Sequence, residues 1–158
     1  IGGIRMKTLI AYYSRTGANE SLAQELQKRL KADMERIEDV KGYSGPIGFI
    51  KGGRDATKKK VGEIKPFQKD PSKYDLVIML TPFWAGLVPP AIRAYVSQNK
   101  FKKVALASVS GSGEENKDAL PDFEKLAGRT VASMLLSKKE FETGAYKQKL
   151  EGFVRKIS

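Results

Sequence analysis

Cysteine and histidine are both absent from this 158-residue chain. Without them the protein cannot build a disulfide, a thiolate nucleophile, a Cys–His metal site or a Ser–His–Asp triad. A metal site made of carboxylates is still open to it, but no carboxylate cluster has the spacing of a calcium-binding loop. No side chain is a convincing acid, base or nucleophile. We therefore expect no metal ion and assign no catalytic residue.

Long apolar runs are missing as well. No run approaches the roughly 20 apolar residues of a membrane-spanning helix, and no secretory leader is recognised, so the expected location is cytoplasmic. The length and the 41% hydrophobic content predict a single domain over residues 1–158, able to bury roughly 70% of its unfolded surface. Residues 1–5 precede Met6. We expect them to be a remnant or a short extension and leave them out of the fold prediction.

Negative charge is scarce: 18 acidic residues face 29 basic ones, a net charge of +11. The excess is concentrated in residues 41–70, which hold eight basic residues against three acidic ones. Such clusters speed association with polyanions, but no basic-aromatic nucleic-acid motif accompanies this one. A solvated basic face is the simpler interpretation, and nucleic-acid binding is not expected.

The most informative stretch is residues 8–20, TLIAYYSRTGANE. A short apolar run typical of a buried strand ends in a small polar turn, and leucines at four-residue spacing (Leu22, Leu26, Leu30) predict the helix that follows. A helix N-terminus offers unpaired N–H groups and a positive dipole end. Gly17 permits close approach of the backbone to a ligand, and Arg15 adds charge. This turn therefore suits a phosphate monoester, although a strand-to-helix turn with no ligand would look similar.

The rest of the chain alternates apolar strands with helices. The expected strands are Leu9–Tyr13, Met34–Val40, Asp75–Leu80, Lys103–Val109 and Thr130–Leu136. The expected helices are Asn19–Lys31, one that Pro89 and Pro90 open, one that ends near Ala127 before Gly128, and a final one with Tyr146, Leu150, Phe153, Val154 and Ile157 on its apolar face.

Between the second and third strands, Lys41–Pro71 is too long for a simple loop. A helix is expected within Pro46–Lys60, where Gly52 and Gly53 each weaken it by roughly 1 kcal/mol.

This alternation predicts an open parallel sheet covered on both faces. In such sheets, ligands bind beyond the carboxyl ends of the strands, where the strand order reverses. Three loops of distinctive composition follow the first, third and fourth strands. We expect these loops to form the binding site.

Two of these loops carry a family resemblance. The segment Ser14–Asn19 resembles the phosphate loop of the flavodoxin-like family, which reads hydroxyl–any–Thr–Gly–Asn–Thr. The segment Thr81–Pro90, TPFWAGLVPP, is similar to the Thr-Pro-x-Trp-x-Gly…Pro-Pro pattern of many flavodoxin-domain proteins. Both follow a strand in the right order, and the resemblance covers essentially the whole chain. It implies an α/β/α three-layer sandwich with a five-stranded parallel sheet, order 2-1-3-4-5, and FMN as cofactor.

The resemblance also assigns residues to FMN. Ser14, Arg15, Thr16, Gly17, Ala18 and Asn19 would surround the phosphate, through backbone N–H groups and the side chains of Ser14, Thr16 and Asn19. Thr81, Pro82, Phe83, Trp84, Ala85 and Gly86 would lie on one side of the flavin ring, and Ser110, Gly111, Ser112 and Gly113 at its edge. Phe83 and Trp84 are expected to offer stacking surface, while the glycine-rich loop offers unobstructed backbone N–H groups.

Each assignment has a structural alternative. Trp84 could pack under the helix that it precedes. The side chains of adjacent residues can point in opposite directions, so Phe83 could point to the side opposite that of Trp84. Arg15 could be a solvated loop charge, and Ser110–Gly113 an ordinary connection. Glu114 and Glu115 are expected to face solvent or to start a helix.

Three features depart from the family pattern. Ala18-Asn19 replaces the usual Asn-Thr, so one side-chain contact to phosphate is lost or shifted by a residue. The loop after the fourth strand lacks the aromatic residue that electron-carrier flavodoxins stack on the outer flavin face. Those flavodoxins are acidic, whereas this chain carries +11, and charge complementarity sets partner choice.

Three functions follow. The preferred one is an FMN-binding protein in electron transfer, with a redox protein partner. The alternative is an FMN-dependent reductase that takes hydride from NADH or NADPH and passes it to a small-molecule acceptor such as a quinone. The third is a domain without cofactor that binds partners or polyanions.

Overall fold

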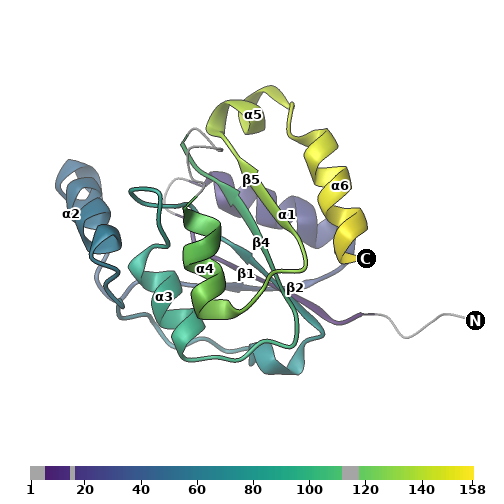
Figure 1. Ribbon diagram of the computed structural model, residues 1–158, viewed down its shortest axis with the longest axis horizontal. Helices are drawn as coiled ribbons and strands as arrows, with labels where there is room; N and C mark the ends of the chain where they lie inside the picture. Colours follow the sequence, from purple (N-terminus) through teal and green to yellow (C-terminus); the bar gives the residue numbers. More distant parts are fainter. Residues whose placement is uncertain (1–5, 15–16, 112–117) are drawn as a thin grey trace, which may run out of the picture.

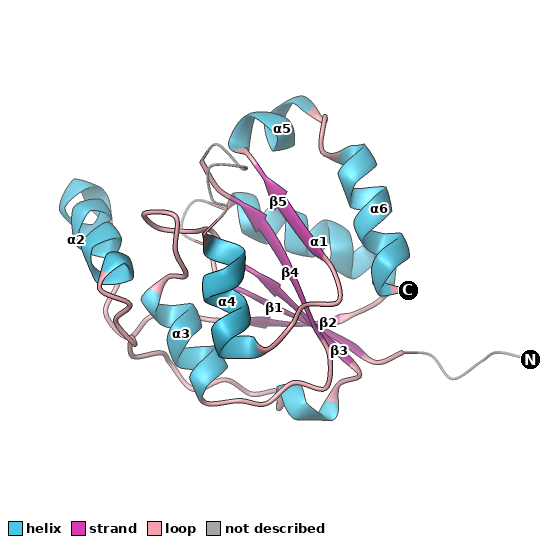
Figure 2. Ribbon diagram, in the orientation of Figure 1, coloured by secondary structure: helices cyan, strands magenta, loops and turns pink. Residues whose placement is uncertain are grey.

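The computed structural model describes residues 6–14, 17–111 and 118–158. Five parallel strands form one sheet in the order β2-β1-β3-β4-β5, with helices on both of its faces (Figure 1, Figure 2). This architecture and strand order confirm the three-layer α/β fold that the sequence predicts.

The strands are β1 (Thr8–Tyr12), β2 (Asp33–Arg36), β3 (Leu76–Leu80), β4 (Val104–Val109) and β5 (Ser133–Leu136). The helices are α1 (Ala18–Leu30), α2 (Gly45–Thr57), α3 (Pro90–Ser97), α4 (Ala119–Ala127), α5 (Lys138–Thr143) and α6 (Lys147–Ile157), with a short 3-10 helix at Pro71–Lys73.

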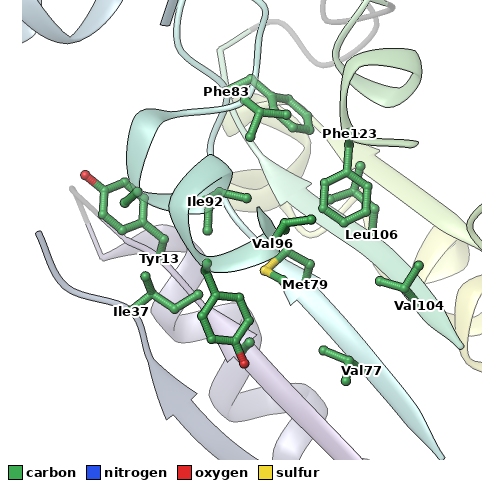
Figure 3. Packing of buried hydrophobic residues seen from close by; sticks show 14 of the residues in the cluster. Tyr13, Ile37, Val77, Met79, Phe83, Ile92, Val96, Val104, Leu106 and Phe123 are labelled. Atoms are coloured by element: carbon green, nitrogen blue, oxygen red, sulfur yellow. The ribbon is translucent and has the colours of Figure 1, made fainter. Parts of the chain in front are cut away.

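Successive side chains of the central strands enter two different hydrophobic cores, because side chains alternate between the faces of a sheet. Leu9 and Ala11 of β1 lie in the core on the α3 and α4 side, and Ile10 and Tyr12 lie in the core on the α1 and α6 side. Figure 3 shows the first of these cores, which includes Val77, Met79, Ile92, Val96, Leu106 and Phe123. With both faces covered, the strands are continuous apolar runs.

Both edge strands are shorter than predicted. The second was expected over Met34–Val40, but β2 ends at Arg36. The N–H of Ile37 still donates to Tyr12 of β1, and from Glu38 onward the chain pairs with residues 63–65. The N–H of Val40 donates to the carbonyl of Glu63 at 2.9 Å, and that of Lys65 to Glu38 at 2.9 Å. The fifth strand was expected from Thr130, but β5 begins at Ser133.

Helix α5 was not predicted from the sequence. Its N-terminus is a capping box: Ser137 Oγ accepts from the N–H of Glu140 at 3.0 Å, and the Glu140 carboxylate accepts from the N–H of Ser137 at 3.1 Å. The Ser-x-x-Glu spacing at the end of β5 is a known helix-start signal, so the sequence did contain the information.

Helix α2 runs without a break through Gly52 and Gly53, within the segment where a weakened helix was predicted. Gly52 lies against the ring of Trp84, and a Cβ atom there would lie 2.9 Å from Cε3 of that ring. Gly53 has nothing within 4 Å of the equivalent position. Packing against Trp84 therefore requires a glycine at position 52, whereas position 53 has room for a side chain.

This difference gives a matched pair of substitutions. Gly53→Ala is expected to raise the free energy of unfolding by about 1 kcal/mol, the gain in helix propensity. Gly52→Ala is expected to lower it by about 1–2 kcal/mol, because overpacking against Trp84 outweighs the same gain. Urea unfolding followed by the fluorescence of Trp84, the single tryptophan, measures both. Equal stabilisation by the two alanines would mean that α2 does not pack on Trp84.

Candidate functional site

The candidate site lies at the carboxyl ends of β1, β3 and β4, which are neighbours in the sheet. The loops that leave these strands therefore converge at one end of the molecule, as ligand-binding loops do in open parallel sheets. Arg15, Thr16, Ser112 and Gly113, and also Glu114 and Glu115, lie outside the described residues.

The loop that leaves β1, called loop one below, leads into α1 through Gly17. Gly17 has a φ of 93°, which a glycine adopts without strain, and its N–H donates to Ser14 Oγ at 3.0 Å. No side chain in the described part of the chain caps the helix N-terminus. Among the described residues, no acceptor is found for the N–H groups of Ala18, Asn19 and Glu20. An uncapped first turn of this kind presents positive N–H groups to an anion.

A cavity of about 260 Å³ lies beside this helix start. Ala18 of α1 and Val109 of β4 line one part of it, and Lys138, Phe141 and Glu142 of α5 line the rest. The N–H of Lys138 also donates to the carbonyl of Gly111 at 3.1 Å, which ties α5 to the loop after β4. Lys138 is a candidate site residue that was not predicted from the sequence, because the helix that carries it was not predicted.

The Asn19 side chain requires a correction. It was predicted to hydrogen-bond phosphate, but it is buried and occupied by the backbone of β4: Nδ2 donates to the carbonyl of Val109, and Oδ1 accepts from the N–H of Val109, both at 2.9 Å. Asn19 therefore fastens α1 to β4. Its backbone N–H has no acceptor among the described residues.

Loop three, residues 81–89 between β3 and α3, contains a tight hairpin turn. Trp84 and Leu87 exchange two backbone hydrogen bonds, of 2.9 and 3.0 Å. Between them Ala85 and Gly86 both have positive φ, 51° and 74°, the pattern of a type I′ turn. Alanine is an uncommon residue at such a backbone angle. Ala85 is exposed and Gly86 half-buried, so the backbone of this turn faces the outside of the loop.

The rings of Phe83 and Trp84 do not form the exposed wall that was predicted. Phe83 is 6% and Trp84 9% exposed to solvent, and both belong to the core on the α3 and α4 side. Trp84 packs between two tyrosine rings, with centroid distances of 5.7 Å to Tyr13 and 5.0 Å to Tyr43. It also packs beneath Gly52 of α2.

Ser110 joins loop three to the loop after β4. Its Oγ accepts from the N–H of Phe83 and donates to the carbonyl of Phe83, both at 3.0 Å. Thr81 is fully buried, and its hydroxyl donates a hydrogen bond to the carbonyl of Pro82 at 2.8 Å. The two side chains therefore hold the loops in shape, and the groups left at the surface are mainly backbone: those of Pro82, Ala85, Gly86 and Gly111.

Two carboxylates support the tyrosines around Trp84. The hydroxyl of Tyr13 donates to Asp39, and that of Tyr43 donates to Asp55 Oδ2 at 2.9 Å. Burial raises the pKa of Asp39, while the hydrogen bond from Tyr13 opposes that shift. Burial, followed by the carboxylate of Asp55, raises the pKa of Tyr43. Tyr43 therefore stays protonated at neutral pH and serves as a hydrogen-bond donor.

A larger and more open hollow, of about 610 Å³, lies at the opposite end of the sheet. It is lined by Phe67, Gln68, Lys69, Asp70, Ser72, Gln98, Asn99 and Lys100, which precede β3 and β4. Because ligands of open parallel sheets bind at the carboxyl ends, we place the candidate functional site at the smaller cavity.

Within the described part of the chain, no group of acidic side chains could hold a metal ion. No helix there is long and apolar enough to cross a membrane.

The fold is similar to those of solved flavoproteins. A flavoprotein from Lactobacillus acidophilus NCFM, in complex with FMN, is 20% identical with a TM-score of 0.70, over 90% of this chain and 99% of that one. A protein from Bacteroides uniformis ATCC 8492, proposed to be a flavoprotein, is 21% identical with a TM-score of 0.71, over 92% and 98%. A WrbA-like flavodoxin from Agrobacterium tumefaciens is 16% identical with a TM-score of 0.52, over 87% and 89%.

No family model matches this chain, and no curated protein matches it in sequence. The structural likeness therefore shows a flavodoxin-like fold.

Proposed function

We propose that this protein binds FMN at the carboxyl ends of β1, β3 and β4 and acts in electron transfer. The observation that carries the proposal is the uncapped start of α1, where three backbone N–H groups lack an acceptor among the described residues beside a cavity that Lys138 lines. The FMN complex of the Lactobacillus flavoprotein, which has the same fold, supports it.

The phosphate would bind at the start of α1. The N–H groups of Ala18, Asn19 and Glu20 would donate to its oxygens, assisted by the helix dipole. The Ser14 hydroxyl accepts from Gly17, which leaves its proton to donate to the phosphate. Lys138 would add a positive charge from α5. Arg15 and Thr16 stay as predicted ligands from the loop sequence.

The flavin ring would lie between the turn at Ala85-Gly86 and the loop that begins at Ser110. When bound, the flavin supplies the electron transfer itself. This chain would orient the ring through the backbone of loop three, whose shape Phe83 and Trp84 fix from the core. The N–H groups of Gly111 and of the predicted Ser112 and Gly113 would reach the ring edge.

Titration of the cofactor-stripped protein with FMN, followed by quenching of flavin fluorescence, tests the proposal. We expect saturation at one FMN per chain. Lys138→Gln should weaken binding about two- to fivefold, the loss of one solvent-exposed charge interaction. Lys139→Gln is the matched control, because that exposed neighbour does not line the cavity. The absence of saturation at tens of micromolar FMN would refute the proposal, and equal effects of both substitutions would remove Lys138 from the site.

A reductase is the second candidate function. It is favoured by the loop after β4, SGSGEENKD from Ser110, which has no aromatic residue to cover the outer face of the ring. An open outer face leaves room for a nicotinamide or a small acceptor. Steady turnover of NADH or NADPH with a quinone by the FMN-loaded protein would support the reductase, and FMN binding without turnover would leave the electron carrier.

A further inference from the structure

Helix α2 carries the most exposed large hydrophobic side chains of the described residues, and two of them, Ile47 and Ile50, lie on its outer face, opposite the buried Gly52, Asp55 and Ala56. Ile47 is 83% exposed, Ile50 72% and Phe49 70%, whereas the next, Val61, is 58% exposed. Exposed apolar side chains that gather on one element mark an interaction surface more often than scattered ones do.

The packing of the inner face fixes this orientation. Gly52, Asp55 and Ala56 are the buried residues of the helix. Gly52 lies against Trp84, and Asp55 accepts the hydroxyl hydrogen bond of Tyr43. A rotation that buried Ile47 and Ile50 would break both contacts, so the fold holds these side chains outward.

The exposed charges of the same helix are all positive. Lys51 and Arg54 are exposed, and Lys58 follows directly at the helix C-terminus. The only carboxylate of the helix, that of Asp55, is 4% exposed and faces inward. Lys51 and Lys58 take part in none of the ion pairs among the described residues. The outer face therefore combines protruding apolar side chains with unneutralised cations.

We propose that the outer face of α2 docks onto the surface of an anionic lipid bilayer. A bilayer interface accepts protruding apolar side chains to a depth of about 5–10 Å and attracts each Lys or Arg at an anionic surface. The shape fits this occupant, because α2 stands at the outer edge of the molecule beyond α3 (Figure 1). No residue of α2 lines either of the two cavities described above. A second copy of the chain fits less well, since its own +11 charge repels it.

Vesicle binding with a site-specific probe tests this proposal, which depends on no property of the FMN site. The chain has no cysteine, so Ile50→Cys gives one site for an environment-sensitive fluorophore. Val131→Cys, an exposed apolar position outside α2, is the matched control. With vesicles of phosphatidylcholine containing about one third phosphatidylglycerol, we expect a blue-shifted emission at position 50 and none at position 131. Vesicles of phosphatidylcholine alone should give no shift at either.

Cosedimentation of unlabelled protein with the same anionic vesicles measures the affinity. The double variant Ile47→Ser/Ile50→Ser should bind at least about tenfold more weakly, because two apolar side chains no longer enter the interface. Lys51→Gln/Lys58→Gln should also bind at least about fivefold more weakly, whereas Lys102→Gln/Lys103→Gln, exposed elsewhere on the surface, should bind like the native chain. Thermal unfolding of the variants checks that each remains folded.

Several outcomes would overturn the proposal. The native protein could remain in the supernatant with anionic vesicles, or the double serine variant could bind as well as the native chain, which would indicate charge attraction without docking of α2. Without vesicle binding, self-association that this variant abolishes would assign the face to a second copy. Electron transfer to an acidic redox protein that the same variant weakens would then assign it to a protein partner.

Discussion

Replacing Asp122 by alanine is expected to lower the free energy of unfolding by about 3–5 kcal/mol, the usual effect of leaving a buried charge without its partner. Asp122 of α4 and Arg93 of α3 form an ion pair, with exposures of 5% and 4%. The same carboxylate accepts from the N–H of Val88 at 3.1 Å, and Lys59 Nζ lies 3.7 Å from Oδ1. Asp122 therefore joins α4, α3 and loop three.

A double variant distinguishes the destabilisation caused by an unpaired buried charge from that caused by lost packing. Arg93→Leu/Asp122→Leu replaces the pair by apolar side chains, a change that is often neutral or stabilising when both partners are removed. We expect urea denaturation to give the double variant a smaller loss than Asp122→Ala. A loss below about 1 kcal/mol for Asp122→Ala would contradict the buried ion pair.

Replacing Asn19 by alanine is expected to cost about 2–4 kcal/mol, because two buried backbone groups of Val109 lose their partners. The side chain joins α1 to the end of β4 across 90 positions of sequence. Gln24→Ala is the control, since Gln24 is an exposed side chain of the same helix and should change stability by no more than about 0.5 kcal/mol.

This second prediction separates the two roles considered for Asn19. A residue that only binds phosphate would, on replacement, weaken FMN binding and leave the unfolding of the cofactor-stripped protein unchanged. A residue that fastens α1 to β4 destabilises that protein directly. Thermal unfolding of Asn19→Ala without FMN therefore distinguishes them, and an unchanged midpoint would return the side chain to the phosphate site.

Local patterns were enough to predict most of the fold. Apolar runs such as Leu76–Leu80 are recognisable as buried strands by themselves, and α4 ends at Gly128 as expected, where φ is 92°. The strand order came from the family resemblance of the loops after β1 and β3. The sequence also placed loop one correctly between a strand and a helix.

The side-chain roles in the site were harder to predict, because they depend on contacts between distant residues. The Asn19 amide bonds Val109, and Trp84 packs against Tyr13, Tyr43 and Gly52. No local pattern around either residue specifies these partners. Polar and aromatic residues in a binding motif suggest ligand contacts, and here the fold uses these two to hold the loops.

The binding of FMN compared with that of riboflavin is the most direct test of the central claim, that the start of α1 holds a phosphate. The two ligands share the flavin ring and differ in the phosphate alone. We expect FMN to bind at least about tenfold more tightly, since hydrogen bonds to a charged group contribute about 1.5–3 kcal/mol each. Equal affinities for the two ligands would show that no phosphate binds at α1 and would contradict this account.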